Sequence, residues 1–357
     1  MLNFAIGPVM MESKVLEIGA KQLPYFRTGD FSAIMKENEA WLLDMLSAPE
    51  GARCVFLTAS GTGAMEASVS EILGAEDKAL IINGGTFGQR FVNLCRLHGK
   101  NSIECKLPFG KNITREMLET YVDRSVTTLL VNMNETSSGT LYDMRIISDF
   151  CKEHDLFLMI DAIGSFLADD LDMEDLGADV VIVSSQKALA LPPGLSMVAL
   201  SKSALSRVEN YRSNNLYLSI KEALKDGERG QTPFTPAVSI LLQLHYRLSS
   251  IRENGGTKKE QQGIRQIAVA FRKGIEDLPL TLFSENPSNA VSALYTQKEN
   301  AKQIVDVLRE NYQIWVCPNG GEYAQKVFRV GHLGAIQDED NEKILVALSA
   351  LNAQGLL

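Results

Sequence analysis

The sequence contains few of the residues that would indicate a disulfide-stabilised or zinc-binding protein. It has 4 histidines and 5 cysteines in 357 residues, and it contains neither a Cys-x-x-Cys pair nor a His-Glu-x-x-His segment. Metal sites and disulfide frameworks depend on such spacings. We therefore expect no metal site, and we interpret the scattered cysteines as reduced thiols of a cytoplasmic protein.

Long apolar runs and a basic excess are also absent. No apolar stretch reaches the roughly 18 residues that a membrane-spanning helix needs, and the first residues lack the basic start and apolar core of a signal peptide. The net charge is −9, so there is no basic excess to neutralise nucleic-acid phosphates. A P-loop segment, Gly-x-x-x-x-Gly-Lys-Ser/Thr, is missing as well. We expect no membrane partner, no nucleic-acid partner and no P-loop NTPase activity.

Continuous apolar runs alternate with helical patterns between about residues 53 and 201. Such runs are typical of strands that are buried on both faces, and they occur at 54–58, 79–83, 128–132, 157–161 and 180–184. A further run at 197–200 follows a Pro-Pro-Gly turn and is expected to return antiparallel. The alternation predicts an α/β fold with a mostly parallel central sheet and helices on both faces.

The pattern changes after a long predicted helix over 238–254, which Gly255-Gly256 ends. Short strands and helices then alternate, and they predict a smaller C-terminal α+β domain. The expected organisation is an N-terminal segment near the active site, a large cofactor-binding domain and a small C-terminal domain, over residues 1–14, 15–245 and 246–357.

Three polar features follow predicted strands, at the edge where α/β proteins bind ligands. The first is the small-residue turn Thr58-Ala59-Ser60-Gly61-Thr62-Gly63-Ala64, whose N–H groups and hydroxyls could bind a phosphate at a helix N-terminus, or form an ordinary capped turn. The second is Asp161, which could alternatively be a plain N-cap. The third is Lys187. A partly desolvated lysine suits Schiff-base chemistry, although most lysines are solvated surface residues. An anion site, a carboxylate and an amine together are what pyridoxal 5'-phosphate requires.

With these motifs the sequence resembles the class V aminotransferases, which are pyridoxal-phosphate enzymes of fold type I, and within them the alanine–glyoxylate and serine–pyruvate enzymes. The resemblance covers nearly the whole chain and rests on Gly7-Pro8 and the segments 26–31, 60–64, 134–139, 161–165, 185–194 and 328–334. Phe26 replaces the histidine of the family's His-Arg-x-x-x-Phe pattern. The resemblance implies a pyridoxal-phosphate enzyme that acts as a homodimer.

The same resemblance implies a role for each matching residue. Lys187 would form the Schiff base and move the Cα proton, and Asp161 would pair with the ring nitrogen. The remaining cofactor contacts would be Ile163 and Phe87 on the ring faces, Thr136 near the phenolic oxygen, and Ser60, Gly61, Thr62 and Gln186 at the phosphate. Thr235 would reach the phosphate of the neighbouring subunit, with Thr232 as a second possible match.

Three further residues are substrate-binding candidates. Arg329 would bind the substrate α-carboxylate through its two-pronged guanidinium, although a surface salt bridge is the simpler alternative. Gly7 would line the same pocket with its backbone. Arg27 would either contact an anionic substrate or brace the N-terminal segment.

The predicted function is transfer of an amino group from an alanine-, serine- or glycine-type donor to a 2-oxo acid such as pyruvate or glyoxylate. The alternatives are a 2-aminoethylphosphonate–pyruvate aminotransferase and another class V reaction, a desulfurase or lyase. A desulfurase would need a reactive cysteine on a mobile loop, for which Cys317 is a weak candidate. A cofactor-binding regulator would need a basic DNA-binding region, which the composition does not indicate.

Overall fold

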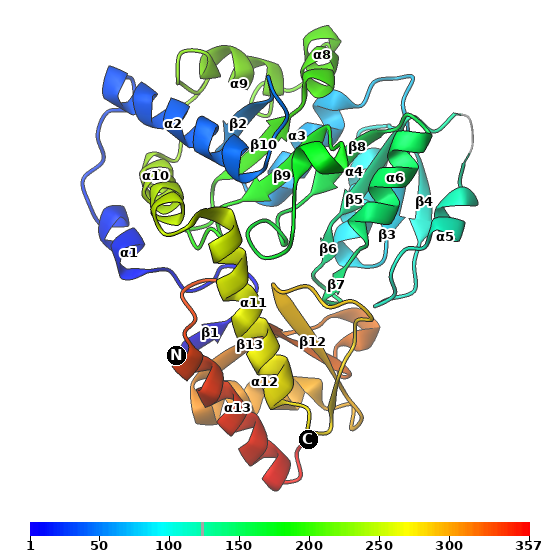
Figure 1. Cartoon of the computed structure of the whole chain (residues 1–357), viewed down its shortest axis with the longest axis vertical. Coiled ribbons are helices and arrows are strands. Elements are labelled where there is room, and N and C mark those ends of the chain that lie inside the picture. The colour runs from blue at the N-terminus through cyan, green and yellow to red at the C-terminus, as the bar shows by residue number, and fades with distance from the viewer. Residues whose placement is uncertain (123–124) are drawn as a thin grey trace.

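The computed structural model describes residues 1–122 and 125–357 and shows two parts, one above the other in Figure 1. The upper part is built on a seven-stranded sheet and the lower part on a five-stranded sheet. Helix α11 (Gly256–Gly274) runs from the upper part into the lower one, and we propose that it connects the two domains. Within the described ranges no helix is both long enough and apolar enough to cross a membrane.

The large sheet is mostly parallel. Its strand order is β2 (Arg53–Leu57), β10 (Ser196–Leu200), β9 (Val180–Ser184), β8 (Phe157–Asp161), β5 (Thr128–Asn132), β3 (Lys78–Asn83) and β4 (Asn101–Lys106). Strand β10 pairs antiparallel with both β9 and β2, whereas β9, β8, β5, β3 and β4 pair in parallel. The six strands predicted for this sheet are confirmed, including the antiparallel one. Strand β4 was not predicted.

Helices cover both faces of this sheet, because successive side chains of each strand point to opposite sides. Leu80 and Ile82 of β3 pack into one core with residues of α2 (Gly29–Met45), α6 (Met144–Glu153) and α10 (Val238–Glu253). Ala79 and Ile81 pack into the other core with residues of α3 (Gly61–Ile72), α4 (Thr86–Leu97) and α8 (Lys202–Asn210). The predicted α/β fold class is confirmed. The shorter elements of this part are α1 (Ser13–Gly19), α5 (Arg115–Glu119), α7 (Met173–Leu176), α9 (Ile220–Gly227), β6 (Asn134–Glu135) and β7 (Thr140–Leu141).

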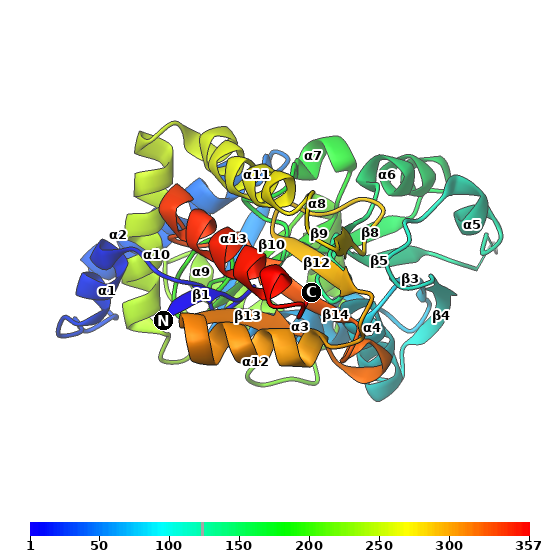
Figure 2. The same cartoon turned by 90° about the horizontal axis from the view of Figure 1, so that it is seen from below.

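The small sheet contains the first strand of the chain. Its order is β1 (Leu2–Phe4), β13 (Ile314–Pro318), β14 (Val327–Gly331), β12 (Val291–Thr296) and β11 (Leu280–Leu282). Strand β1 pairs parallel with β13, and the other pairs are antiparallel. Helix α12 (Ala301–Tyr312) packs against β13 and β14, while α13 (Asp338–Ala353) packs against α11 (Figure 2). The smaller α+β unit agrees with the prediction, apart from the participation of β1.

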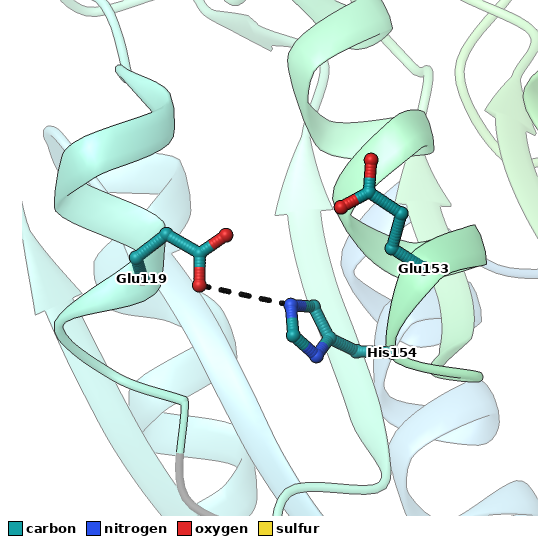
Figure 3. Close-up of side chains that lie close together, drawn as sticks. All are labelled: Glu119, Glu153 and His154. Atoms are coloured by element: carbon teal, nitrogen blue, oxygen red, sulfur yellow. Dashed lines mark ion pairs between the residues drawn. The ribbon is translucent and has the colours of Figure 1, made fainter.

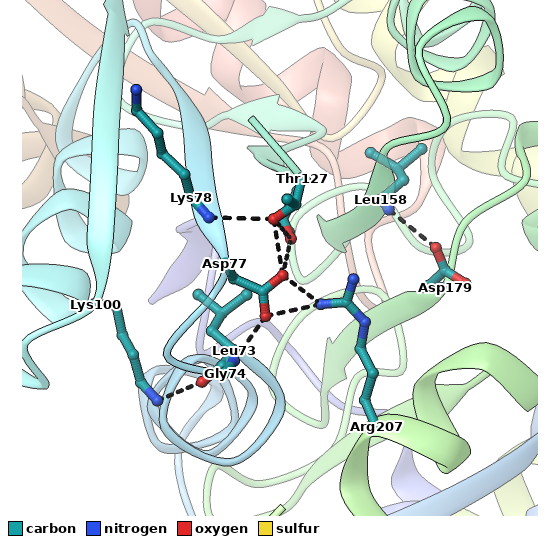
Figure 4. A network of polar contacts seen from close by, with 10 residues as sticks. Leu73, Gly74, Asp77, Lys78, Lys100, Thr127, Leu158, Asp179 and Arg207 are labelled. Carbon is teal, nitrogen blue, oxygen red and sulfur yellow. Dashed lines mark hydrogen bonds and ion pairs between the residues drawn. The ribbon is translucent and has the colours of Figure 1, made fainter. Parts of the chain in front are cut away.

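A polar network ties together the amino ends of the parallel strands (Figure 4). Asp77, just before β3, accepts hydrogen bonds from Arg207 of α8 at 2.9 and 3.0 Å and from the hydroxyl of Thr127 at 2.8 Å. Asp179, just before β9, accepts from the Leu158 N–H at 3.0 Å. Because these contacts lie at the amino ends, they brace the sheet and leave the carboxyl ends open for the site described next.

Candidate active site

Loops that follow five strands of the large sheet meet at its carboxyl edge, around a cavity of about 130 Å³. In a parallel sheet this edge is where ligands bind. The cavity brings together ten of the thirteen predicted site residues, namely Gly7, Ser60, Gly61, Thr62, Phe87, Thr136, Asp161, Ile163, Gln186 and Lys187. Arg90, Asn134 and Gly164 complete its lining. Arg27, Thr235 and Arg329 are not part of the lining.

Four residues of the cavity lining form a group with free hydrogen-bond donors, here named the anion site: Ser60, Gly61, Thr62 and Gln186. Ser60 is the N-cap of α3, yet its side chain makes no capping hydrogen bond. The N–H groups of Gly61 and Thr62 have no acceptor among the described residues. Gln186 accepts from the Ser184 hydroxyl at 2.6 Å through its oxygen, which leaves its NH₂ group as a donor. Free donors at the positive end of a helix dipole favour an anion.

Gly61 packs closely against the Ile163 side chain at this turn. A Cβ on Gly61 would lie 2.4 Å from Cδ1 of Ile163, so close that the Ile163 side chain would have to move. The glycine therefore allows the loop after β2 to approach the loop after β8, and this contact brings the anion site next to Asp161.

Asp161 is a buried carboxylate with few partners. Its Oδ1 accepts a hydrogen bond from the Ile163 N–H at 2.9 Å. This bond stabilises the loop that follows β8 and is not a helix N-cap. Burial raises its pKa to about 6, while this hydrogen bond and the positive charges of Arg90 and Lys187 oppose the rise. A buried carboxylate with this environment favours a cationic group in the cavity beside it.

Lys187 follows β9 and lies beside Gly7. Burial lowers its pKa to about 8, Asp161 and Cys317 oppose this shift, and Arg329 and Arg90 add to it. Gly7 has a φ of +148°, and a Cβ at this position would lie 2.8 Å from Cδ of Lys187. The N-terminal segment thus holds the lysine side chain in place, and the amine is closer to neutrality at pH 7 than an exposed lysine is.

Phe87 lines the cavity near the start of α4. The carboxylate of the buried Glu135 accepts the N–H groups of Phe87 and Gly88, each at 3.1 Å. Glu135 therefore binds the N-terminus of α4, where a negative charge is favoured by the helix dipole. This contact fixes the position of the Phe87 ring in the cavity wall.

Arg329, on β14 of the small domain, lies just behind the cavity wall. Its Nη1 donates to the carbonyl oxygen of Thr136 at 3.2 Å and its Nη2 to that of Pro318 at 2.8 Å. Burial lowers its pKa, and its Nε has no hydrogen-bond partner among the described residues. A mostly buried guanidinium that forms no ion pair with a carboxylate in the described ranges favours an anionic ligand.

Arg27 and Thr235 lie away from the cavity. The two Nη atoms of Arg27 donate to Gln231 at 3.2 Å and to the Pro233 carbonyl at 3.3 Å, so Arg27 braces the N-terminal segment against the loop before α10. Thr235 is exposed on that same loop. Neither residue lines the cavity of its own chain.

Sequence reasoning missed Arg90 and Asn134. Arg90 lies three residues after Phe87 on α4, and this spacing, which places both on one helix face, was the available signal. Asn134 belongs to a segment already identified, but its amide donates to Ser288 of the small domain at 2.8 Å. That partner is distant in the sequence, and no local pattern indicates it.

The one group of three potential metal ligands in the described ranges lies elsewhere, on the surface between α5 and α6 (Figure 3). It consists of Glu119, Glu153 and His154. Arg115 already forms ion pairs with both glutamates, so their charge is compensated by the protein itself. The cluster is best described as a surface ion-pair group.

Comparison with known proteins identifies relatives over almost the whole chain. The family model "Aminotransferase class-V" matches residues 25–333. A Synechococcus protein named soluble hydrogenase, small subunit, is 30% identical, covering 97% of this chain and 91% of the relative. The L-aspartate–glyoxylate aminotransferase of Paracoccus denitrificans is 29% identical, covering 80% of this chain and 74% of the relative.

The fold is shared with solved structures. The aspartate aminotransferase of subgroup IV from Thermus thermophilus superimposes with a TM-score of 0.92 over 100% of both chains, at 24% sequence identity. The match confirms the predicted α/β fold class, and at this level of identity it is evidence for the fold alone.

Proposed function

The chain belongs to the class-V aminotransferase family and is an aminotransferase, and we propose that it works with pyridoxal 5'-phosphate bound in the cavity at the carboxyl edge of the large sheet. The observation that carries this proposal is the convergence of three groups on one cavity: the anion site, the Asp161 carboxylate and the Lys187 amine. The donors at Gly61 and Thr62 fit a phosphate. The buried, weakly partnered Asp161 fits a cationic ring nitrogen, and Lys187 fits the aldehyde.

The cofactor supplies, when bound, an electron sink conjugated with the amino group that is transferred. The residues that surround the cofactor each have a separate role. Lys187 has an amine whose pKa is lowered to about 8, so near neutral pH it can both accept and release a proton at Nζ. Asp161 holds a negative charge at the floor of the cavity. Phe87 and Ile163 line the cavity and are suited to contact a flat ring and exclude water from it.

We propose Arg329 as the site for the substrate carboxylate. Its guanidinium contacts the Thr136 carbonyl in the cavity wall and is mostly buried without a carboxylate partner. Arg27 is bound to Gln231 and Pro233, so of the two arginines predicted to bind substrate only Arg329 is left, and this suits a donor with a single carboxylate. The proposed reaction moves the amino group of alanine, serine or glycine to pyruvate or glyoxylate; the Paracoccus relative is named for glyoxylate as well.

The assignment of Thr235 depends on a second copy of the chain. Thr235 is exposed and outside the cavity of its own chain, which fits its proposed contact with the phosphate in the neighbouring subunit. We therefore propose a cytoplasmic homodimer.

The hydrogenase name of the Synechococcus relative is not carried over, because no group of potential metal ligands in the described ranges includes a cysteine. Cys317 lies within β13 and not on a loop, which disfavours a desulfurase.

The test is a spectroscopic titration of the purified protein with alanine, serine, glycine, aspartate, glutamate and 2-aminoethylphosphonate. A cofactor absorption band that is converted by a small monocarboxylic donor, and restored by pyruvate or glyoxylate, would support the proposal and identify the donor. A band converted only by aspartate or by the phosphonate would replace the proposed donor. Borohydride reduction followed by peptide mass analysis should locate the cofactor on Lys187, and attachment to another lysine would refute that assignment.

A further inference from the structure

Arg90 is a charged residue of the cavity that the assigned roles leave unexplained. It lies on α4, lines the cavity, and places its guanidinium carbon 4.7 Å from the centre of the Phe87 ring. Its Nη1 donates a hydrogen bond to the Thr62 hydroxyl at 3.0 Å. Within the described ranges no carboxylate forms an ion pair with it. A half-buried guanidinium held by an aromatic ring and a hydroxyl is thus a fixed positive charge, which forms no ion pair in the described ranges although it is close enough to Asp161 to lower the pKa of that carboxyl.

The hydrogen bond from Arg90 also determines what Thr62 can do. A threonine hydroxyl has one proton to donate and accepts through its oxygen. Because Arg90 fills an acceptor position on Thr62 Oγ1, the hydroxyl proton is left for another partner. Thr62 lies in the first turn of α3, beside the free N–H groups of Gly61 and of Thr62 itself. The hydroxyl can therefore join the donors of the anion site.

The charge of a phosphate also calls for a cation at the anion site. A phosphate monoester carries about −1.5 to −2 charges at pH 7, whereas a helix N-terminus offers roughly half a positive charge. The amide of Gln186 and the hydroxyls of Ser60 and Thr62 are neutral. Lys187, the other cation lining the cavity, is assigned to the aldehyde in the proposed function. Arg90 is the remaining cation of the lining.

We propose that Arg90 is a phosphate-binding residue of this aminotransferase: it supplies the fixed positive charge of the anion site and turns the Thr62 hydroxyl into a donor. The inference rests on the proposed function, since it concerns the phosphate of the same cofactor. It also explains why Arg90 and Phe87 are one helix turn apart. The cation–π contact then holds the charge in place before the cofactor arrives.

The test compares binding of pyridoxal phosphate and of pyridoxal, which lacks the phosphate, to the cofactor-free protein. We expect Arg90→Gln to weaken binding of pyridoxal phosphate by about tenfold or more, the equivalent of one charge-assisted hydrogen bond. Binding of pyridoxal should change by less than about twofold. Arg90→Lys should recover part of the loss, because it restores the charge without the planar fork. Arg96→Gln, an exposed arginine of the same helix, is the matched control and should alter neither affinity.

Equal weakening of both ligands by Arg90→Gln would overturn the inference, because it would mean that Arg90 acts through the Phe87 ring. Unchanged binding of pyridoxal phosphate would overturn it too. If Arg90→Gln does not fold, the test uses Arg90→Lys and measures how strongly inorganic phosphate competes with pyridoxal phosphate for the variant and for the wild type. Weaker competition by phosphate in the variant supports the proposed role of Arg90, and equal competition contradicts it. A wild-type protein that binds neither ligand would refute the proposed function itself. A wild type and an Arg90→Gln variant that prefer pyridoxal phosphate over pyridoxal to the same degree would refute only the role of Arg90.

Discussion

Gly7 and Lys187 are packed so closely that a single methyl group on Gly7 would lie 2.8 Å from Cδ of the lysine. The backbone of Gly7 also adopts a φ of +148°, which residues with a side chain rarely tolerate. The N-terminal segment is therefore part of the wall that positions the proposed reactive amine, although it lies 180 residues earlier in the sequence.

Gly7→Ala should displace the Lys187 side chain and lower kcat/KM by about tenfold to a hundredfold, because small misplacements of reacting groups have large effects on rate. Steady-state kinetics at saturating cofactor would measure the loss. Gly320→Ala is the matched control, since a Cβ there meets no atom within 4 Å. Comparable activities of the two variants would contradict the positioning role of Gly7.

Covalent capture of the cofactor should depend on pH through Lys187. The pKa of its amine is lowered to about 8, and the neutral amine is the nucleophile. The rate of attachment of pyridoxal phosphate to the cofactor-free protein should therefore rise with pH and level off above about 8. Stopped-flow absorbance would measure it. A midpoint near 10, as for an exposed lysine, would show that the amine is not desolvated.

Asp161→Asn should stabilise the cofactor-free protein and weaken cofactor binding. Burial raises the pKa of Asp161 to about 6 in the folded state, above the roughly 3.9 of an unfolded chain. The folded state therefore binds the proton more tightly, and this carboxylate costs stability as the pH rises from about 4 to about 6. The cost approaches about 3 kcal/mol at neutral pH. Denaturant unfolding of both proteins without cofactor would measure it, and a less stable variant at pH 7 would contradict the prediction.

Arg329→Ala should raise KM for the 2-oxo acid by about tenfold or more, because a charge-assisted pair to the carboxylate is lost. The kcat value should change less, since Arg329 does not contact the reacting atoms in this proposal. Arg309→Ala, on the outer side of α12, serves as the control because Arg309 pairs with Asp306 and Glu310 at the surface. An unaltered KM would place the carboxylate site elsewhere.

Asp77→Ala should lower the free energy of unfolding by about 1–3 kcal/mol and leave the kinetics of the folded enzyme unchanged. The carboxylate has partners on three segments at the amino ends of the strands, namely Arg207, Thr127 and Gly74, and the active site lies at the opposite ends. Asp306→Ala, which removes a solvent-exposed pair with Lys302, should change stability by less than about 0.5 kcal/mol. A large loss of kcat in folded Asp77→Ala would contradict this separation.

The central sheet could be predicted because most of its strands contain continuous apolar runs. Strands β5, β8 and β9 are buried along their whole length, and such runs have few other interpretations. Strand β4 was missed because it lies at the edge of the sheet and includes the polar residues Asn101, Glu104 and Lys106. An edge strand needs neither continuous hydrophobicity nor strict alternation.

The candidate site was predictable to the extent that it lies in loops directly after these strands. Asp161 and Lys187 were found for that reason, and their catalytic roles stay predictions. Contacts between distant segments could not be found in the same way. The hydrogen bond of Asn134 to Ser288 and that of Arg329 to Thr136 depend on how the small domain docks on the large one, and no local sequence pattern encodes that docking.

The pairing of β1 with β13 has a consequence for how the enzyme is made. Leu2, Asn3 and Phe4 are synthesised long before the residues with which they pair, Ile314, Trp315 and Val316. Domains generally fold as they emerge, so the large domain can form while the N-terminal strand is still unpaired. Gly7 can reach Lys187 in its final position only after synthesis has passed β13. Competence for catalysis should thus arise only after β13 has been synthesised and has paired with β1.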